Sequence, residues 1–522
     1  MSEFESVDVL ILGAGGAGYP AAFFLDRAGH SVVLADPVGN LGGDCLAEGC
    51  VPSKAVREAA LVRGLADKFD GFGLHGCKKP AADWRAVLAH KDRVQQTRYT
   101  QHNAEIASSR VLFRSARGVI TGPNTARLEL ASDRAHELRF NHLILGTGSR
   151  PARLPIPGAE LAITSHELFR LGADLPQPRH LVIIGGGYIG VESASMLQGL
   201  GTEATVLEYS AQLLPGFDIE LASFLHTSLV QRVRIELSAQ VLGIERNGTD
   251  FTVRYRQNLQ EFTVQGDAVL MATGRLPVLP EGIEHLNLQR ERGHVMVDET
   301  LCTSNPRVWA PGDVNGRSML FHSAVRQSLV AAHCIAAGGQ AVDRMDFNAI
   351  PITVFTEPEL AHVGLTATLA EAALGADTVA VTRYDYAQDS RAQIYGETQG
   401  FIKLVFSRRD TRLLGAQIAG PGGAIISLLA MCTPSSILAF VVAGQWQHPR
   451  FAVWRYYIRS ILVPIASGLI LASAALMLKT SVHSAAAWLL SLATAVLLRR
   501  TTLNPLGLLA IGTLLGWFGV LG

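Results

Sequence analysis

Short apolar runs that end at once in a cluster of glycines are the main feature of this chain. Residues 7–12 are apolar except for Asp8, and glycines follow at positions 13, 15 and 18. Such runs, bounded by turn residues, are typical of strands buried in a parallel sheet. The pattern predicts a strand over 7–12, a glycine turn, a helix of small residues, and a second strand over 31–35 that ends at Asp36.

The same arrangement recurs further along the chain. Residues 181–184 lead into glycines at 185, 187 and 190, and a strand predicted over 204–207 ends at Glu208. In a dinucleotide-binding turn the first glycines let the backbone approach a pyrophosphate, the third allows close helix packing, and the acid accepts from a ribose hydroxyl. A single copy is weak, because an ordinary strand–helix turn also needs glycine. Two copies, each with its acid, predict two nucleotides and an electron relay.

The acid at the second turn also bears on the choice of nucleotide. The carboxylate of Glu208 would repel a 2′-phosphate, and residues 209–211 contain no arginine. NAD is therefore favoured over NADP at this turn.

Charge and composition narrow the class of protein. Lys plus Arg and Asp plus Glu both number 45 in 522 residues, which gives no electrostatic case for a nucleic-acid partner. The acidic start of the chain lacks the basic region of a signal peptide, so we expect a cytoplasmic catalytic part. After Asp410 there is no Asp or Glu, and residues 461–478, 484–498 and 503–521 are uncharged apolar stretches. Their lengths predict a transmembrane-type tail attached to the inner membrane.

Two of the six cysteines, Cys45 and Cys50, lie five positions apart where a helix is expected to begin. A helix N-terminus and the nearby Lys54 favour thiolate, which suits disulfide exchange. Two alternatives are unpaired core cysteines and half of a zinc site, although no further Cys or His stands nearby at ligand spacing. We predict a redox pair that forms a disulfide, and no metal. Asp44 is expected to raise the pKa of the Cys45 thiol.

At these residues the chain resembles the pyridine nucleotide disulfide reductase family, from residue 7 to about 428. Further matching pieces are the turn at 146–148, the turn at 272–275 and the segment 309–314. The resemblance implies FAD and NAD as cofactors, an ion pair of Lys54 with Glu192 beside the flavin, and Tyr188 where nicotinamide enters. It also implies Cys50 next to the flavin and Cys45 exchanging with substrate.

The implied site falls into three sets. The catalytic residues are Cys45, Cys50, Lys54 and Glu192. The FAD residues are Gly13, Gly15, Gly18, Asp36, Lys54, Thr147, Gly148, Gly312 and Asp313. The NAD residues are Gly185, Gly187, Tyr188, Gly190, Glu208 and Gly274.

The segments 387–391, 400–403 and 414–420 look like the interface domain of the dihydrolipoamide dehydrogenase branch. The expected fold is α/β, with two Rossmann-like domains, a truncated α+β interface domain and an all-α membrane-type tail. The expected domains are an FAD domain over 1–150 and 275–345, an NAD domain over 151–274, an interface domain over 346–428, and the tail over 429–522. The expected partners are a lipoyl-type dithiol or disulfide and a second copy of the chain, held by a weakened interface.

The family pattern stops near residues 427–430. The resemblance implies a terminal His-Pro segment with a Glu, whose histidine is a base for the partner's cysteine. Here the residue five positions after His448 of His448-Pro449 is Val453 rather than Glu. We interpret that His-Pro as a coincidence and expect weak dithiol turnover. The tail instead resembles the end of a chromate transporter. The alternatives are therefore an anion transporter component fused to a flavoprotein, or an FAD-binding hybrid with only NADH oxidase or diaphorase activity.

Overall fold

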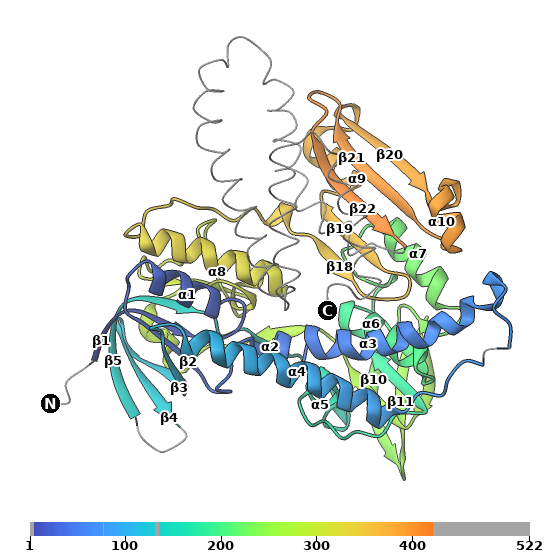
Figure 1. Ribbon diagram of the computed structural model, residues 1–522, viewed down its shortest axis with the longest axis horizontal. Coiled ribbons are helices and arrows are strands. Elements are labelled where there is room, and N and C mark those ends of the chain that lie inside the picture. Colours follow the sequence, from blue (N-terminus) through green and yellow to red (C-terminus); the bar gives the residue numbers. More distant parts are fainter. Residues whose placement is uncertain (1–4, 77, 131–134, 421–522) are drawn as a thin grey trace, which may run out of the picture. The chain divides into compact units, whose positions relative to one another are not determined.

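The computed structural model describes residues 5–76, 78–130 and 135–420, which all belong to the first of two contact-defined units, 1–431 and 432–522. Figure 1 shows the helices and strands of the described part. Within that part no helix is both long and apolar enough to cross a bilayer. The predicted tail over 429–522, with its three apolar stretches, lies outside the described residues.

The first sheet is built around β1 (Glu5–Leu12), which runs parallel to β2 (Val32–Asp36) and to β5 (Ala135–Leu145). β3 (Leu112–Gly122) pairs with two strands. Its first residues pair parallel with β2, and its later residues pair antiparallel with β4 (Thr125–Leu130). β4 returns antiparallel to β5, completing a meander. Late in the chain, β17 (Val308–Trp309) adds to β5 in parallel, so residues after 300 come back to the first sheet.

The second sheet has four parallel strands in the order β13-β7-β8-β9. Their bounds are β7 His180–Ile184, β8 Glu203–Leu207, β9 Arg234–Glu236 and β13 Ala268–Met271. A separate antiparallel meander consists of β10 (Gln240–Asn247), β11 (Asp250–Gln257) and β12 (Gln260–Gly266). The chain passes between the first and second sheets through a short ladder of β6 (Ser149–Pro151) and β14 (Arg275–Pro277).

The third large sheet is antiparallel, in the order β18-β19-β22-β21-β20. Its strands are β18 Ile352–Val354, β19 Leu360–Gly364, β20 Val379–Asp385, β21 Phe401–Ser407 and β22 Leu413–Ala419. A small ladder joins β15 (Arg290–Glu291) to β16 (His294–Val295). Together the sheets show an α/β fold with a further antiparallel part.

Ten α-helices are described, and α3 and α4 lie side by side in Figure 1. Their bounds are α1 Tyr19–Arg27, α2 Gly43–Ala47, α3 Cys50–Gly64, α4 Trp84–Ala107, α5 Ser165–Phe169, α6 Tyr188–Gly199, α7 Ile219–Leu229, α8 Phe321–Ala336, α9 Ala367–Leu374 and α10 Ser390–Tyr395. α1 and α6 each begin directly after a glycine turn, at the predicted places. α1 carries Pro20 in its first turn, where the missing N–H has no helical partner to lose.

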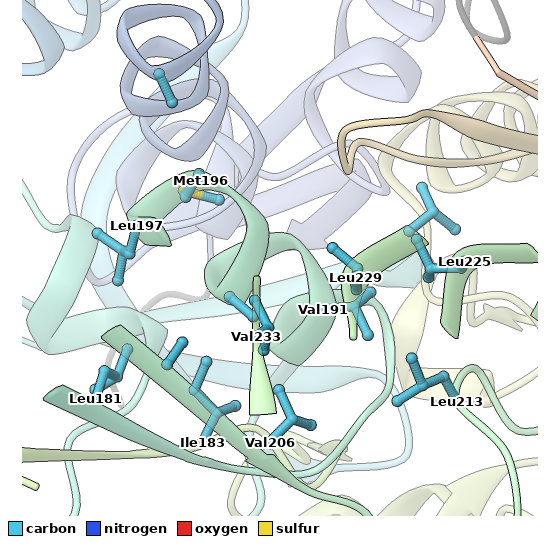
Figure 2. Packing of buried hydrophobic residues seen from close by; sticks show 14 of the residues in the cluster. Leu181, Ile183, Val191, Met196, Leu197, Val206, Leu213, Leu225, Leu229 and Val233 are labelled. Atoms are coloured by element: carbon cyan, nitrogen blue, oxygen red, sulfur yellow. The ribbon is translucent and has the colours of Figure 1, made fainter. Parts of the chain in front are cut away.

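The largest buried cluster joins α6 to the strands of the second sheet. Figure 2 shows Val191 and Leu197 of α6 facing the strands that carry Ile183 and Val206, and all four are fully buried. Buried residues of α3, α4 and α5 belong to the same cluster. The helices that carry the cysteine region are thus anchored on the second sheet through shared apolar contacts.

A buried ion cluster ties β21 to α7. The Nζ of Lys403, a residue only 3% exposed, lies 2.8 and 2.7 Å from the two carboxylate oxygens of Asp218 and 2.9 Å from Oε1 of Glu220. Removing one partner of a buried ion pair leaves an unpaired buried charge.

We expect Lys403→Met to lower the free energy of unfolding by about 3–5 kcal/mol, measured by urea denaturation. The control is Arg383→Met, because Arg383 pairs with Glu220 at the surface, where such pairs contribute about 0–1 kcal/mol. Equal losses in the two variants would contradict the distinction between the buried and the exposed pair.

Candidate functional site

A cavity of about 1530 Å³ runs between the glycine turn of the first sheet and that of the second. Most of the residues singled out from the sequence line it. These are Gly13, Gly15, Asp36, Cys45, Cys50, Lys54, Thr147, Gly148, Gly187, Tyr188, Glu192, Gly274 and Asp313. The remaining five, Gly18, Gly185, Gly190, Glu208 and Gly312, are not lining residues, and their contacts below show that they support the turns.

The first glycine turn needs glycine for steric reasons. Gly13 has φ +102°, and a Cβ there would stand 2.2 Å from the carbonyl oxygen of Gly146. A Cβ on Gly18 would lie 1.8 Å from the oxygen of Gly13, so α1 packs directly on its own turn. By contrast, a Cβ on Gly15 would meet only ordinary contact at 3.6 Å, and this glycine faces the cavity.

The second turn repeats this geometry. Gly185 has φ +108° with the oxygen of Ala272 at 2.4 Å from an added Cβ, and a Cβ on Gly190 would lie 1.9 Å from the oxygen of Gly185. A Cβ on Gly187 would have nothing within 4 Å. In both turns two glycines allow the close packing of the turn, and the middle glycine leaves the approach from the cavity open.

The two acids brace their turns in the same way. Asp36 Oδ2 accepts a 2.8 Å hydrogen bond from Ala14 N, and Glu208 Oε2 accepts one of 2.5 Å from Gly186 N. The second oxygen of each carboxylate accepts from a backbone N–H two residues on, at Val38 and Ser210. Burial raises the pKa of Asp36.

The cysteine pair lies at the junction of two helices. Cys45 is in the short α2, and Cys50 is the first residue of α3, which agrees with the expected helix start. Both are free cysteines in this structure, so the predicted disulfide stays a prediction. Hydrogen bonding between the two thiol groups raises the pKa of Cys45 and, with help from Lys54, lowers the pKa of Cys50 to about 7.

The positive charge near Cys50 is held by a specific ion pair. Lys54 Nζ lies 2.7 Å from Glu192 Oε2, which is the pairing implied by the resemblance. The other oxygen of Glu192 accepts from Phe355 N at 2.9 Å, and Lys54 Nζ also stands 4.4 Å from the Phe355 ring centre. The lysine therefore connects α3 to α6 and to the chain that follows β18.

Asp44 acts differently from the prediction. Its carboxylate pairs with Arg275, and burial raises the pKa of Asp44 to about 6. The raised pKa of Cys45 comes first from its hydrogen bond to Cys50 and then from burial. The expectation that Asp44 raises the pKa of Cys45 is therefore replaced by a thiol–thiol interaction, which the sequence could not show.

The segment after β17 comes back to the first turn. A Cβ on Gly312, at φ +83°, would lie 2.8 Å from Cβ of Ala17. Next to it, Asp313 lines the cavity and accepts a hydrogen bond from the Ser149 hydroxyl. Residues more than 290 positions apart thus meet at one wall of the cavity.

Several site residues gave no signal in the sequence. Glu48, between the two cysteines, contacts the imidazole of His166 on α5, and both line the cavity. His322 on α8 has its Nε2 2.7 Å from the oxygen of Pro351 and also lines the cavity. Cys302 and Cys334 are free cysteines, while Cys77 and Cys432 lie outside the described residues. Among the described residues no cluster of three metal-ligating side chains occurs.

The cavity suits two dinucleotides by its shape and chemistry. It is large, and it is lined by Gly15 and Gly187. Because these residues have no side chain, each would admit a pyrophosphate close to the backbone. Tyr188 lines it from the second turn, 39% exposed and with its ring 5.5 Å from Phe217. The cysteine pair lines the same cavity.

This combination of fold and site defines a class of nucleotide-linked redox protein. The pyridine nucleotide-disulphide oxidoreductase family matches residues 7–328, and the dimerisation domain of that family matches residues 350–447. The chain belongs to this family, and its cofactors are FAD and NAD. The chromate transporter family matches residues 411–517, overlapping the dimerisation match and extending into residues that the structure does not describe.

Curated relatives agree with this membership. The chain is 32% identical to a dihydrolipoyl dehydrogenase of Geobacillus stearothermophilus, over 84% of this chain and 92% of that protein. It is 32% identical to dihydrolipoyl dehydrogenase 3 of Pseudomonas aeruginosa, over 80% and 89%, and 30% identical to the dihydrolipoyl dehydrogenase of Chlamydia muridarum, over 86% and 96%.

Proposed function

We propose that this chain is an FAD-dependent NAD(H):dithiol oxidoreductase of the dihydrolipoyl dehydrogenase type, acting on a lipoyl-type dithiol or disulfide. One observation carries the proposal: the Cys45–Cys50 thiol pair, with the Lys54–Glu192 ion pair beside it, lines the same cavity as both glycine turns. Thiols, flavin and nicotinamide would then share one cavity. The names of the relatives support the lipoyl substrate.

The net reaction converts a dithiol and NAD⁺ into a disulfide, NADH and one proton. FAD, when bound, supplies a carrier that takes two electrons from the thiol pair and gives them up as hydride. Cys45 would exchange with the substrate sulfur, and Cys50 would be the cysteine that passes electrons to FAD. In the reduced pair Cys45 would remain the protonated thiol, because its pKa is raised, while Lys54 would stabilise the Cys50 thiolate.

The remaining residues have supporting roles in this proposal. The turn at Gly13 and Gly15, with Thr147, Gly148 and Asp313, would hold FAD, and Gly187, Tyr188 and Gly274 would hold NAD. Glu208 would accept from a ribose hydroxyl and exclude a 2′-phosphate, which favours NAD.

We also propose the domain division given above, with FAD domain segments over 1–150 and 275–345, an NAD domain over 151–274, an interface domain over 346–428 and the tail over 429–522. A homodimer through the interface domain fits the dimerisation match. Attachment of a cytoplasmic catalytic part to a membrane through the tail rests on the sequence of 429–522 alone.

The chromate transporter match favours a second candidate function, an anion transport component fused to a flavoprotein. The two functions have different readouts in purified protein. NADH oxidation with flavin absorbance supports the oxidoreductase, whereas anion flux into vesicles without NADH oxidation supports transport.

The test of the proposed function compares Cys45→Ser with Cys50→Ser in FAD-loaded full-length protein. NADH reduction of the wild type should produce long-wavelength charge-transfer absorbance from the Cys50 thiolate. Cys50→Ser should lose this band, and Cys45→Ser should retain a thiolate band because the serine hydroxyl can still donate to the Cys50 sulfur. Both variants should lose dihydrolipoamide turnover but still pass electrons from NADH to an artificial dye. An unchanged band in Cys50→Ser would contradict the role given to that residue.

A further inference from the structure

The segment between the two cysteines, residues 46–49, is hydrogen-bonded by a buried side chain that the proposed mechanism does not use. We refer to this segment as the cysteine loop. Gln95, on α4, is fully buried, and its Nε2 donates hydrogen bonds to the carbonyl oxygens of Leu46 at 3.0 Å and Ala47 at 2.9 Å. These two carbonyls belong to the segment that directly follows Cys45. A single amide group therefore fixes the backbone that connects one sulfur to the other.

The orientation of that amide is set by a second buried residue. Lys91, one helical turn before Gln95 and 0% exposed, donates from Nζ to Gln95 Oε1 at 3.0 Å. A flipped amide would place its NH₂ group against the ammonium and its oxygen against the two carbonyls. Both contacts would be repulsive, so Lys91 selects the orientation in which Nε2 faces the cysteine loop.

Lys91 is itself anchored on α5. Its Nζ lies 2.8 Å from the carbonyl oxygen of Arg170 and 3.2 Å from that of Phe169, and it also pairs with Asp92. From the same short helix, His166 contacts Glu48 of the cysteine loop. The loop is thus tied to α4 and to α5, and Lys91 joins these two helices.

We propose that Gln95, oriented by Lys91, is a positioning residue for the cysteine pair: it holds the loop so that the Cys45 and Cys50 sulfurs stay in contact in the reduced state. This inference rests on the proposed exchange at Cys45 and Cys50, and it adds two residues that touch neither substrate nor cofactor. Its physical basis is effective concentration, because a loop held at Leu46 and Ala47 keeps the two thiols close enough to re-form the disulfide.

Two substitutions at Gln95 separate positioning from simple packing. Gln95→Met keeps the length of the side chain but removes both hydrogen bonds to the loop. Gln95→Glu keeps an acceptor for Lys91, yet it turns a donor into an oxygen that repels the two carbonyls. If the donor function matters, Gln95→Glu is the more damaging change even though it adds an ion pair to Lys91.

The measurement is the thiol–disulfide equilibrium of Cys45 and Cys50 in glutathione buffers of varied ratio, with alkylation and mass spectrometry of the peptides. It requires no turnover. We expect the equilibrium constant for disulfide formation to fall about tenfold in Gln95→Glu, equivalent to about 30 mV, and several-fold in Gln95→Met and Lys91→Met. The charge-transfer band of the NADH-reduced, FAD-loaded variants should fall in the same order.

The matched control is Lys403→Met, which removes another buried lysine with carboxylate partners, far from the cysteines in sequence. It should lower unfolding stability without moving the glutathione equilibrium. If the wild-type pair does not form a disulfide at any glutathione ratio, the proposed function fails. If it does so and the Gln95 and Lys91 variants match the wild type, or Lys403→Met shifts the equilibrium equally, the positioning role is overturned. Should Gln95→Glu not fold, Gln95→Met and Lys91→Met decide the question.

Discussion

Replacing Gly190 with valine should abolish NADH reduction of bound FAD, while replacing Gly18 with valine should prevent FAD from binding. In each case the new Cβ would lie within 2 Å of a carbonyl oxygen of the same turn, 1.9 Å at Gly190 and 1.8 Å at Gly18. The helix after the turn must then move away, and its N–H groups leave the place where a pyrophosphate would bind. A displacement of 1 Å costs on the order of 10²-fold in rate.

The two variants report on different sites, which makes the result specific. Gly190→Val should retain flavin absorbance on purification and lose only the reaction with NADH, measured by stopped-flow bleaching of the flavin. Gly18→Val should purify without flavin. The control is Gly64→Ala in α3, where an added Cβ meets nothing within 4 Å, and both properties should remain unchanged. Loss of flavin in Gly190→Val would contradict the assignment of separate nucleotide sites.

The second large effect concerns the protonation of Cys50. Its pKa is lowered to about 7, first by the hydrogen bond from Cys45 and further by Lys54. In Cys45→Ala the first of these causes is lost, and the pKa should rise toward the ordinary thiol value of about 8.5. At pH 7 the thiolate fraction would then fall from about half to a few per cent, as measured by ultraviolet thiolate absorbance against pH.

The lowered pKa of Cys50 also makes the free energy of unfolding depend on pH. A thiol whose pKa is lower in the folded state stabilises the fold above the unfolded pKa, and this contribution is lost as pH falls through about 7. Lys54→Met should raise the titration midpoint of the Cys50 thiol, in the same direction as Cys45→Ala. Cys302→Ala is the control, because burial raises the pKa of Cys302 to about 11 and it contributes no thiolate at neutral pH. An unshifted midpoint in Cys45→Ala would show that the thiol–thiol bond does not stabilise the thiolate.

The local pattern of the sequence was sufficient for the two nucleotide turns. Apolar runs, glycines and an acid at fixed spacing predicted the strands β1, β2, β7 and β8 and the helices that follow the turns. This works because a positive φ and a Cβ-free approach are local requirements that only glycine satisfies. The start of α3 at Cys50 also agreed with the helix start expected at the cysteine pair.

The tertiary structure decided how those pieces act on one another. The thiol–thiol hydrogen bond, the pairing of Asp44 with Arg275 and the hold of Gln95 on the cysteine loop all join side chains to groups that the sequence does not place nearby. The Lys54–Glu192 pair, 138 positions apart, was accessible only through the family resemblance. Charge and hydrogen-bond effects depend on distances of a few ångströms. Those distances are set only when the four helices α3, α4, α5 and α6 pack onto the second sheet.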